Sequence, residues 1–136
     1  MAKDREGADW ILKAMVAVAG ADRELDDREI GLICQVYQDQ SGRAIELVEV
    51  ERVASANEAG DLFKEFAAAS RTLGMETKEE IVRAAYLVLL ADDRIAGEER
   101  KKLKDLAAAL DISEIHFGAI LEDLAVWLAS QRQGSA

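Results

Sequence analysis

Two segments of the chain are apolar at nearly every position. From Trp10 to Ala19 the only charged residue is Lys13, and from Ile81 to Leu90 the only one is Arg83. A helix that is apolar nearly all round has no face suited to water, so it belongs in the centre of a fold. The pattern predicts two central helices, over residues 8–20 and from Thr77 to about residue 90.

The rest of the pattern predicts further helices, because apolar residues recur at helical spacing between polar ones. They are expected over residues 26–42, 43–54, 57–74, 99–110 and from 113 onward. Capping signals support these bounds: Asp26 with Glu29 and Thr77 with Glu80 have the spacing of capping boxes, and Asn57 and Ser113 are typical first caps. Gly42 and Gly74 are typical helix ends. The valines of 43–54 would also suit a strand, but the Ala- and Glu-rich setting favours a helix.

The chain also resembles itself after a shift of seventy positions. The matching pairs are Ile11/Ile81, Ala14/Ala84, Val18/Val88, Ala21/Ala91, Asp22/Asp92, Leu25/Ile95, Glu29/Glu99 and Ile33/Leu103. We interpret this as a duplicated helix–acidic turn–helix unit whose two apolar helices pack against each other. The predicted fold is an all-α, single-domain bundle of about seven helices over residues 1–136, with a core over 8–129 and a flexible tail over 130–136.

Composition supports the helical prediction and narrows the function. The 136 residues are 50% apolar but only 5% aromatic, and they include no proline. The formal net charge of −10 disfavours nucleic acid and anionic lipid as partners. The N-terminal segment has no signal-peptide layout and no segment has the length of a spanning helix, so a cytoplasmic protein without direct membrane insertion is expected. A lone cysteine, Cys34, fits a reducing compartment.

Each apolar segment leads into an acidic turn, "AGADRELDDREI" and "LADDRIAGEERK". Each turn has Ala-Asp, an aliphatic residue three positions after the Asp, and a Glu seven positions after it. This is the spacing of the second half of a calcium-binding EF-hand loop. The first half lacks the required oxygen ligands, since apolar residues and glycine stand in their places. Neither turn is an EF-hand.

Two interpretations of the acidic turns stay open. Glu29 and Glu99 lie in the first turn of a helix, where a carboxylate satisfies free amide groups and complements the helix dipole. Asp22 and Asp92 follow the C-terminal ends of the central helices, where a carboxylate is unfavourable unless something offsets it. Hydrogen bonds within the turn, or ion pairs with nearby arginines, would offset this unfavourable interaction. A hard divalent cation, Ca²⁺ or Mg²⁺ in preference to Zn²⁺, would also do so.

The two acidic turns, each behind an apolar helix, resemble the TerB-like domain of the tellurite-resistance family. The resemblance covers roughly residues 8–125. It implies an all-helical, bacterial, cytoplasmic stress-response domain that binds metal through acidic residues, here Asp22, Glu29, Asp92 and Glu99. Where the family has glycine after the Asp, this chain has Arg23 and Asp93. The positive charge of Arg23 disfavours a cation in the first copy.

Other chemistry is poorly represented. His116 and Cys34 lie among apolar residues and are expected to be structural, and no zinc-ligand spacing or glycine-rich phosphate loop is present. Trp10 and Trp127 are expected to be core or interface anchors. An enzyme, including a carboxylate-and-metal hydrolase, is the class with least support. The sequence therefore predicts a TerB-like stress-response module that binds a divalent metal or, alternatively, a metal-free scaffold whose acidic surface binds a basic protein partner. A homodimer is compatible with either.

Overall fold

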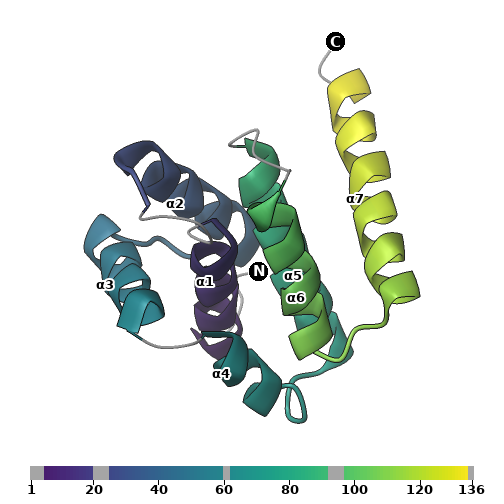
Figure 1. Ribbon diagram of the computed structural model, residues 1–136. Helices are drawn as coiled ribbons and strands as arrows, with labels where there is room; N and C mark the ends of the chain where they lie inside the picture. The colour runs from purple at the N-terminus through teal and green to yellow at the C-terminus, as the bar shows by residue number, and fades with distance from the viewer. Residues whose placement is uncertain (1–4, 20–24, 60–61, 92–96, 135–136) are drawn as a thin grey trace.

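The computed structural model describes residues 5–19, 25–59, 62–91 and 97–134 (Figure 1). These residues form seven α-helices and no strand, which confirms the all-α prediction. The helices are α1 (Arg5–Ala19), α2 (Asp27–Ser41), α3 (Leu47–Ala59), α4 (Leu62–Ala69), α5 (Met75–Ala91), α6 (Glu98–Ala109) and α7 (Glu114–Gly134). None of these helices combines the length and apolarity needed to cross a bilayer.

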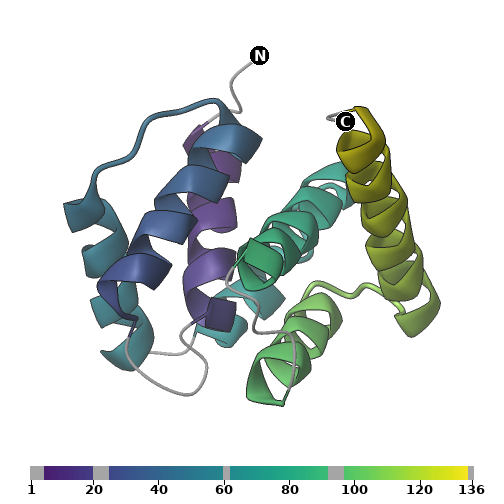
Figure 2. The same ribbon diagram turned by 90° about the horizontal axis from the view of Figure 1, so that it is seen from above.

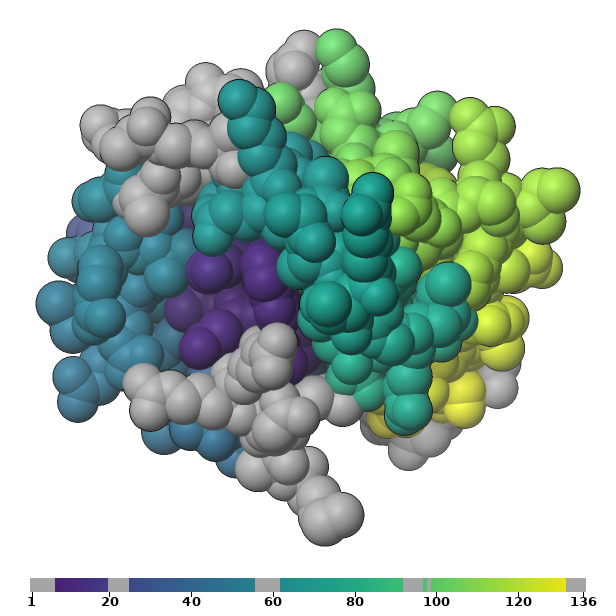
Figure 3. All heavy atoms as spheres, turned by 90° about the horizontal axis from the view of Figure 1, so that it is seen from below, coloured from purple at the N-terminus to yellow at the C-terminus, as the bar shows by residue number. Residues whose placement is uncertain are grey.

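The two apolar helices, α1 and α5, form the centre of the fold. They pack against each other more extensively than any other pair, and α1 also contacts α2, α3, α4 and α6. Both helices contribute many fully buried side chains, among them Ile11, Met15, Ile81 and Val88. In Figure 3 the purple residues of α1 are surrounded by those of α3, α4 and α5. The predicted central position of both helices is confirmed.

The remaining helices surround this pair. Helices α2 and α6 each contact both α1 and α5, while α3 and α4 lie against α1. Figure 2 shows α2 and α3 on one side of the molecule and α6 and α7 on the other. The α1–α2 and α5–α6 pairs make the contacts that a duplicated unit would make. The duplication itself stays a prediction from the sequence.

Several helix ends lie where local sequence signals predicted them. The Asp26 carboxylate accepts from the Glu29 backbone N–H at 2.8 Å, and the Glu29 carboxylate accepts from the Asp26 N–H at 3.0 Å, which completes the predicted capping box. Gly42 ends α2 with φ 72°, a left-handed conformation that glycine adopts without strain. The Ser113 hydroxyl accepts from the His116 N–H at 3.1 Å and so caps α7.

Other bounds differ from the prediction. Asn57 is not a cap, because α3 continues through it to Ala59; the Ala- and Glu-rich sequence sustains the helix past a residue that can also start one. Thr77 does not begin α5 either. The helix starts at Met75, and the Lys78 N–H already bonds to the Gly74 carbonyl at 3.1 Å. Helix α7 extends to Gly134 and includes most of the segment predicted as a tail.

Candidate functional site

The predicted ligand residues of the acidic turns divide into two groups. Asp22 and Asp92 lie outside the described residues. Glu29 and Glu99 lie in the first turns of α2 and α6, and both are buried, with 2% and 8% of their surface exposed. A buried charge is costly unless it is paired, and among the described residues no buried side-chain oxygen or nitrogen lacks a hydrogen-bond partner.

Glu29 has a structural explanation. Its Oε1 accepts the Asp26 N–H, and Asp26 returns the bond, so the carboxylate stabilises the start of α2. The second copy differs, because Gly97 occupies the N-cap position of α6 and makes no side-chain hydrogen bond there. Glu99 is therefore buried without the reciprocal cap that holds Glu29. The capping box therefore explains the carboxylate of the first acidic turn, Glu29, but not that of the second, Glu99.

A complete metal site is not formed by the described part of the chain. Among those residues, no group of three or more His, Cys, Asp or Glu side chains has an arrangement that fits a metal ion. Glu29 and Glu99 are the only two predicted ligands that the structure describes. A cation at either turn would take further ligands from outside residues 5–19, 25–59, 62–91 and 97–134.

A groove that sequence reasoning did not identify lies between α2, α5 and α7. It consists of two adjoining cavities of about 590 and 320 Å³, which share Gln40, Leu87 and Trp127. We call it the α2–α5–α7 groove. Its lining comprises Gln35, Val36, Asp39 and Gln40 from α2, Arg83, Leu87, Leu90 and Ala91 from α5, and Asp123, Leu124, Trp127 and Leu128 from α7.

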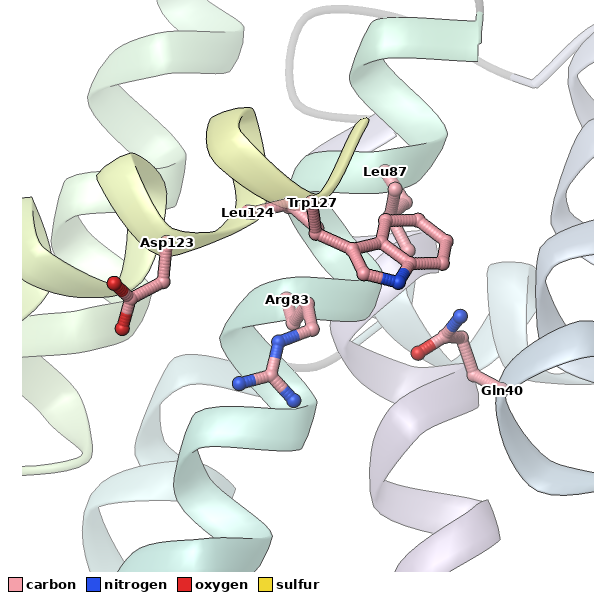
Figure 4. A pocket seen from close by; sticks show the side chains of 6 residues that line it. All are labelled: Gln40, Arg83, Leu87, Asp123, Leu124 and Trp127. Atoms are coloured by element: carbon pink, nitrogen blue, oxygen red, sulfur yellow. The ribbon is translucent and has the colours of Figure 1, made fainter. Parts of the chain in front are cut away.

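The groove has an apolar floor and one prominent aromatic side chain. Leu87 and Leu90 of α5 are half-buried and form the floor. Trp127 of α7 has 49% of its surface exposed, although tryptophan is among the side chains that gain most from burial. In Figure 4 the Trp127 ring lies over Leu87 with its indole nitrogen directed towards Gln40. Such a half-exposed tryptophan beside apolar side chains is typical of a binding surface.

Polar groups lie at one end and along both walls of the groove. Figure 4 shows the Arg83 guanidinium and the Gln40 amide on the side of the groove that the Trp127 nitrogen faces, whereas the Asp123 carboxylate turns away from them. Arg83 makes no hydrogen bond or ion pair with the rest of the described chain. On the wall formed by α2, Asp39 is exposed, and both its carboxylate oxygens lie 3.5 Å from the Gln35 amide nitrogen.

The wall formed by α7 is held at one end and on one side. Its first turn is tied to α5 by a contact within hydrogen-bond distance, 2.7 Å between His116 Nε2 and Glu79 Oε2. Ile120 and Leu124 are buried, and the helix contacts α5 and α6. On the other sides of the same helix, Ile115 and Val126 are 88% and 65% exposed. Helix α7 thus has more apolar surface than the bundle covers.

The histidine and the cysteine have structural surroundings, as predicted. His116 is half-buried and pairs with Glu79. Cys34 is half-buried against the core, and burial raises the pKa of its thiol because a thiolate is poorly solvated there. A raised pKa is opposite to what a cysteine nucleophile needs at neutral pH.

The signal for the groove was present in the sequence but was not specific. Trp127 was predicted to be a core or interface anchor, and apolar residues of α7 fall outside a single helical stripe. That excess indicates a further contact surface, but which helices face it depends on the tertiary arrangement. No family model matches the sequence, and no curated protein or solved structure matches it either.

Proposed function

We propose that this protein is a non-enzymatic interaction scaffold that binds a basic protein partner in the α2–α5–α7 groove. The observation that carries the proposal is the half-exposed Trp127 beside an apolar groove floor. Tryptophan is enriched among the residues that dominate protein–protein binding energies, especially where neighbouring side chains exclude water around it. Covering the groove would bury Trp127 with Leu87 and Leu90.

Charge supports the choice of a basic partner. The chain carries a formal charge of −10, and an exposed carboxylate lies on each wall of the groove, Asp39 on α2 and Asp123 on α7. Complementary charge accelerates encounter and disfavours wrong partners more than it adds to affinity. A basic protein would thus be attracted to this face at low salt and held there mainly by its apolar contacts.

The biological setting is proposed from the resemblance of the acidic turns to the TerB-like family. On that basis the scaffold acts in the cytoplasm of a bacterium, in a response to tellurite or a related stress. The family resemblance and the groove are independent of each other. The binding test below therefore does not depend on the stress that the partner serves.

The scaffold proposal is tested by affinity capture with matched variants. Immobilised wild-type protein is expected to retain a basic protein from a bacterial lysate and to release it as salt is raised. Trp127→Ser should abolish retention, whereas Ile115→Ser, on α7 but outside the groove lining, should not. Equal retention by wild type and both variants, or no retained protein, would contradict the proposal.

A divalent cation at the acidic turns is a second candidate function, and Glu99 is the observation that favours it. The residue has 8% of its surface exposed, and it lacks the reciprocal cap of Glu29. Hard cations accept carboxylate and carbonyl oxygens. Asp92 and Glu99 of the second turn are the proposed ligands, with Asp22 and Glu29 as the corresponding pair of the first.

Calorimetric titration with Ca²⁺, Mg²⁺, Mn²⁺ and Zn²⁺ tests this second candidate. Binding heat should be lost in Asp92→Asn and in Glu99→Gln. It should persist in Glu114→Gln, an exposed first-turn carboxylate of α7 that serves as the matched control. Absence of binding heat in the wild type would remove the cation and leave the scaffold proposal unaffected.

A further inference from the structure

We infer that the occupant of the α2–α5–α7 groove is an amphipathic helix of the partner, with lysine or arginine flanking its apolar face and its C-terminal end next to Arg83. The inference rests on the proposed scaffold function and adds the form, the charge and the direction of the bound segment. Three independent features of the groove support it.

The first feature is the arrangement of the three helices. Helix α5 packs against both α2 and α7, whereas α2 and α7 make no comparable contact with each other. Figure 2 shows the two helices on opposite sides of α5. Helices pack at about 8–10 Å between axes, so a helix laid over α5 would contact all three groove helices at once. A segment bound as an added β-strand would instead need an exposed strand edge to pair with, and the described chain has no strand.

The second feature is the spacing of the apolar side chains. Leu87 and Leu90 are three residues apart on α5, and Leu124 and Leu128 are four apart on α7. These are the spacings at which side chains of one helix fit between those of another. The α5 lining runs from Arg83 to Ala91, which is about 12 Å at 1.5 Å per residue. A stripe of three apolar residues at i, i+4 and i+7 on the incoming helix matches that length.

The third feature is the charge around the groove. Asp39 and Asp123 are exposed on opposite walls, with the Asp123 carboxylate turned outward from Arg83 and Gln40, so long basic side chains that extend over both rims of the groove would be attracted to carboxylates. A second copy of the chain is the competing occupant. Two chains of formal charge −10 would bring like charges together, which opposes that association.

Arg83 gives the bound helix a direction. It is the first of the α5 lining residues, and its guanidinium makes no hydrogen bond or ion pair with the rest of the described chain. The last carbonyls of a helix carry partial negative charge, and a terminal carboxylate adds a full one. An arginine at one end of the floor favours the C-terminal end of the ligand there, with the Gln40 amide and the Trp127 N–H as nearby donors.

The test uses defined peptides and fluorescence anisotropy. The probe is a labelled peptide of about sixteen residues, long enough to form a helix on binding. It carries leucines at i, i+4 and i+7, lysines on both flanks and a free C-terminal carboxylate. The first control has the same composition with the leucines scattered, the second replaces lysine by glutamate, and the third ends in an amide. The wild-type protein should bind the probe at least about tenfold more tightly than the scattered and glutamate controls.

Protein variants locate the peptide and its direction. Trp127→Ala should lower the affinity for the probe peptide by roughly tenfold or more. Val126→Ala, a substitution of its exposed neighbour outside the groove lining, should leave that affinity unchanged. Arg83→Gln should reduce the preference for the carboxylate over the amide peptide and leave binding of the amide peptide nearly unchanged. Far-UV circular dichroism of each variant checks that it is folded.

Each contrary outcome overturns a named part of the inference. Equal binding of the scattered peptide excludes a helical stripe, and stronger binding of the glutamate peptide excludes a basic occupant. Sedimentation that shows a dimer dependent on Trp127 would identify a second copy as the occupant. If a lysate protein is retained through Trp127 but the probe does not bind, the helix inference fails and the scaffold proposal stands. If the wild-type protein binds neither a lysate protein nor the probe peptide, both the helix inference and the scaffold proposal fail.

Discussion

At the scale of single residues, the start of α2 depends on one pair of reciprocal hydrogen bonds. Asp26→Ala removes the acceptor for the Glu29 N–H and is expected to lower the free energy of unfolding by about 1 kcal/mol. Asp27→Ala, one residue on, removes an equal charge from the same turn but no capping bond. Urea denaturation compares the two. Equal losses would show that the dipole alone, and not the cap, stabilises this end.

Asp111 ends α6 in a conformation that few residues adopt. Its φ is 59°, and the Ile112 N–H bonds to the Ala107 carbonyl at 2.9 Å, the closure typical of a Schellman motif. The Asp111 carboxylate also accepts from the Ser70 hydroxyl at 2.8 Å and so links the end of α6 to the end of α4. Aspartate and asparagine tolerate positive φ better than alanine does.

Substitutions at this position separate the two contributions. Asp111→Asn retains an oxygen acceptor and should lower the free energy of unfolding by less than about 0.5 kcal/mol. Asp111→Ala should lower it by about 1–2 kcal/mol. Thermal or urea unfolding measures both. In a double-mutant cycle, Asp111→Ala should lower the free energy of unfolding by less in the Ser70→Ala background than in the wild type. A loss that is the same with and without the Ser70 hydroxyl would assign the whole effect to the backbone.

Burial of Cys34 has a pH consequence with a definite sign. Burial raises the pKa of the folded thiol, so its stabilising contribution is present below the pKa of the unfolded thiol and is lost as pH rises towards the folded value. Alkylation by iodoacetamide requires the thiolate. Its pH profile in the folded protein should therefore lie at higher pH than in urea. Coincident profiles would show that the thiol is not desolvated.

At the scale of elements, α4 is attached to the bundle by aromatic contacts. Phe66 is fully buried, with its ring centre 5.1 Å from that of Trp10 and 6.5 Å from that of Phe63. Phe66→Ala should cost about 3–5 kcal/mol, because it leaves a cavity in the core. Phe63 is half-buried under Lys102, whose nitrogen is 5.1 Å from the ring centre, so Phe63→Ala should cost only about 1–2 kcal/mol. Similar losses, measured by urea unfolding, would contradict this difference.

The elements also show which features a sequence can predict. The Asp26 box, the Ser113 cap and the Gly42 end depend on atoms within a few residues, so local sequence predicts them. Asn57 carries the same kind of signal, but there the helix continues. Whether a residue such as Asn57 starts a new helix depends on whether a continuous helix through that position is more stable. The residues around it in the sequence do not determine which of the two conformations is the more stable.

At the scale of the whole molecule, the core was more predictable than the groove. A helix that is apolar on all sides has only one stable location, so α1 and α5 could be placed at the centre from their patterns alone. The groove combines side chains from α2, α5 and α7, and which of them face one another depends on how three helices pack. Trp127 was identifiable as an anchor, but its neighbours Leu87 and Gln40 are distant in sequence.

The proposed duplication makes its own prediction at this scale. Ala14 of α1 and Ala84 of α5 are equivalent under the seventy-residue shift, and both are fully buried. If the two halves pack equivalently, Ala14→Leu and Ala84→Leu should each cost about 1–3 kcal/mol through overpacking, and by similar amounts. Ala68→Leu, exposed on α4, is the control and should change the free energy of unfolding by less than about 0.5 kcal/mol.

The comparison of the two variants carries the test. Urea unfolding of Ala14→Leu and Ala84→Leu, with the slope of the transition unchanged, gives the two losses directly. Equal losses are expected if the duplication extends to the packing, since α2 and α6 each contact both central helices. A large loss at one site with a neutral result at the other would show that the two helices are packed inequivalently. The repeat would then describe the sequence without describing the packing.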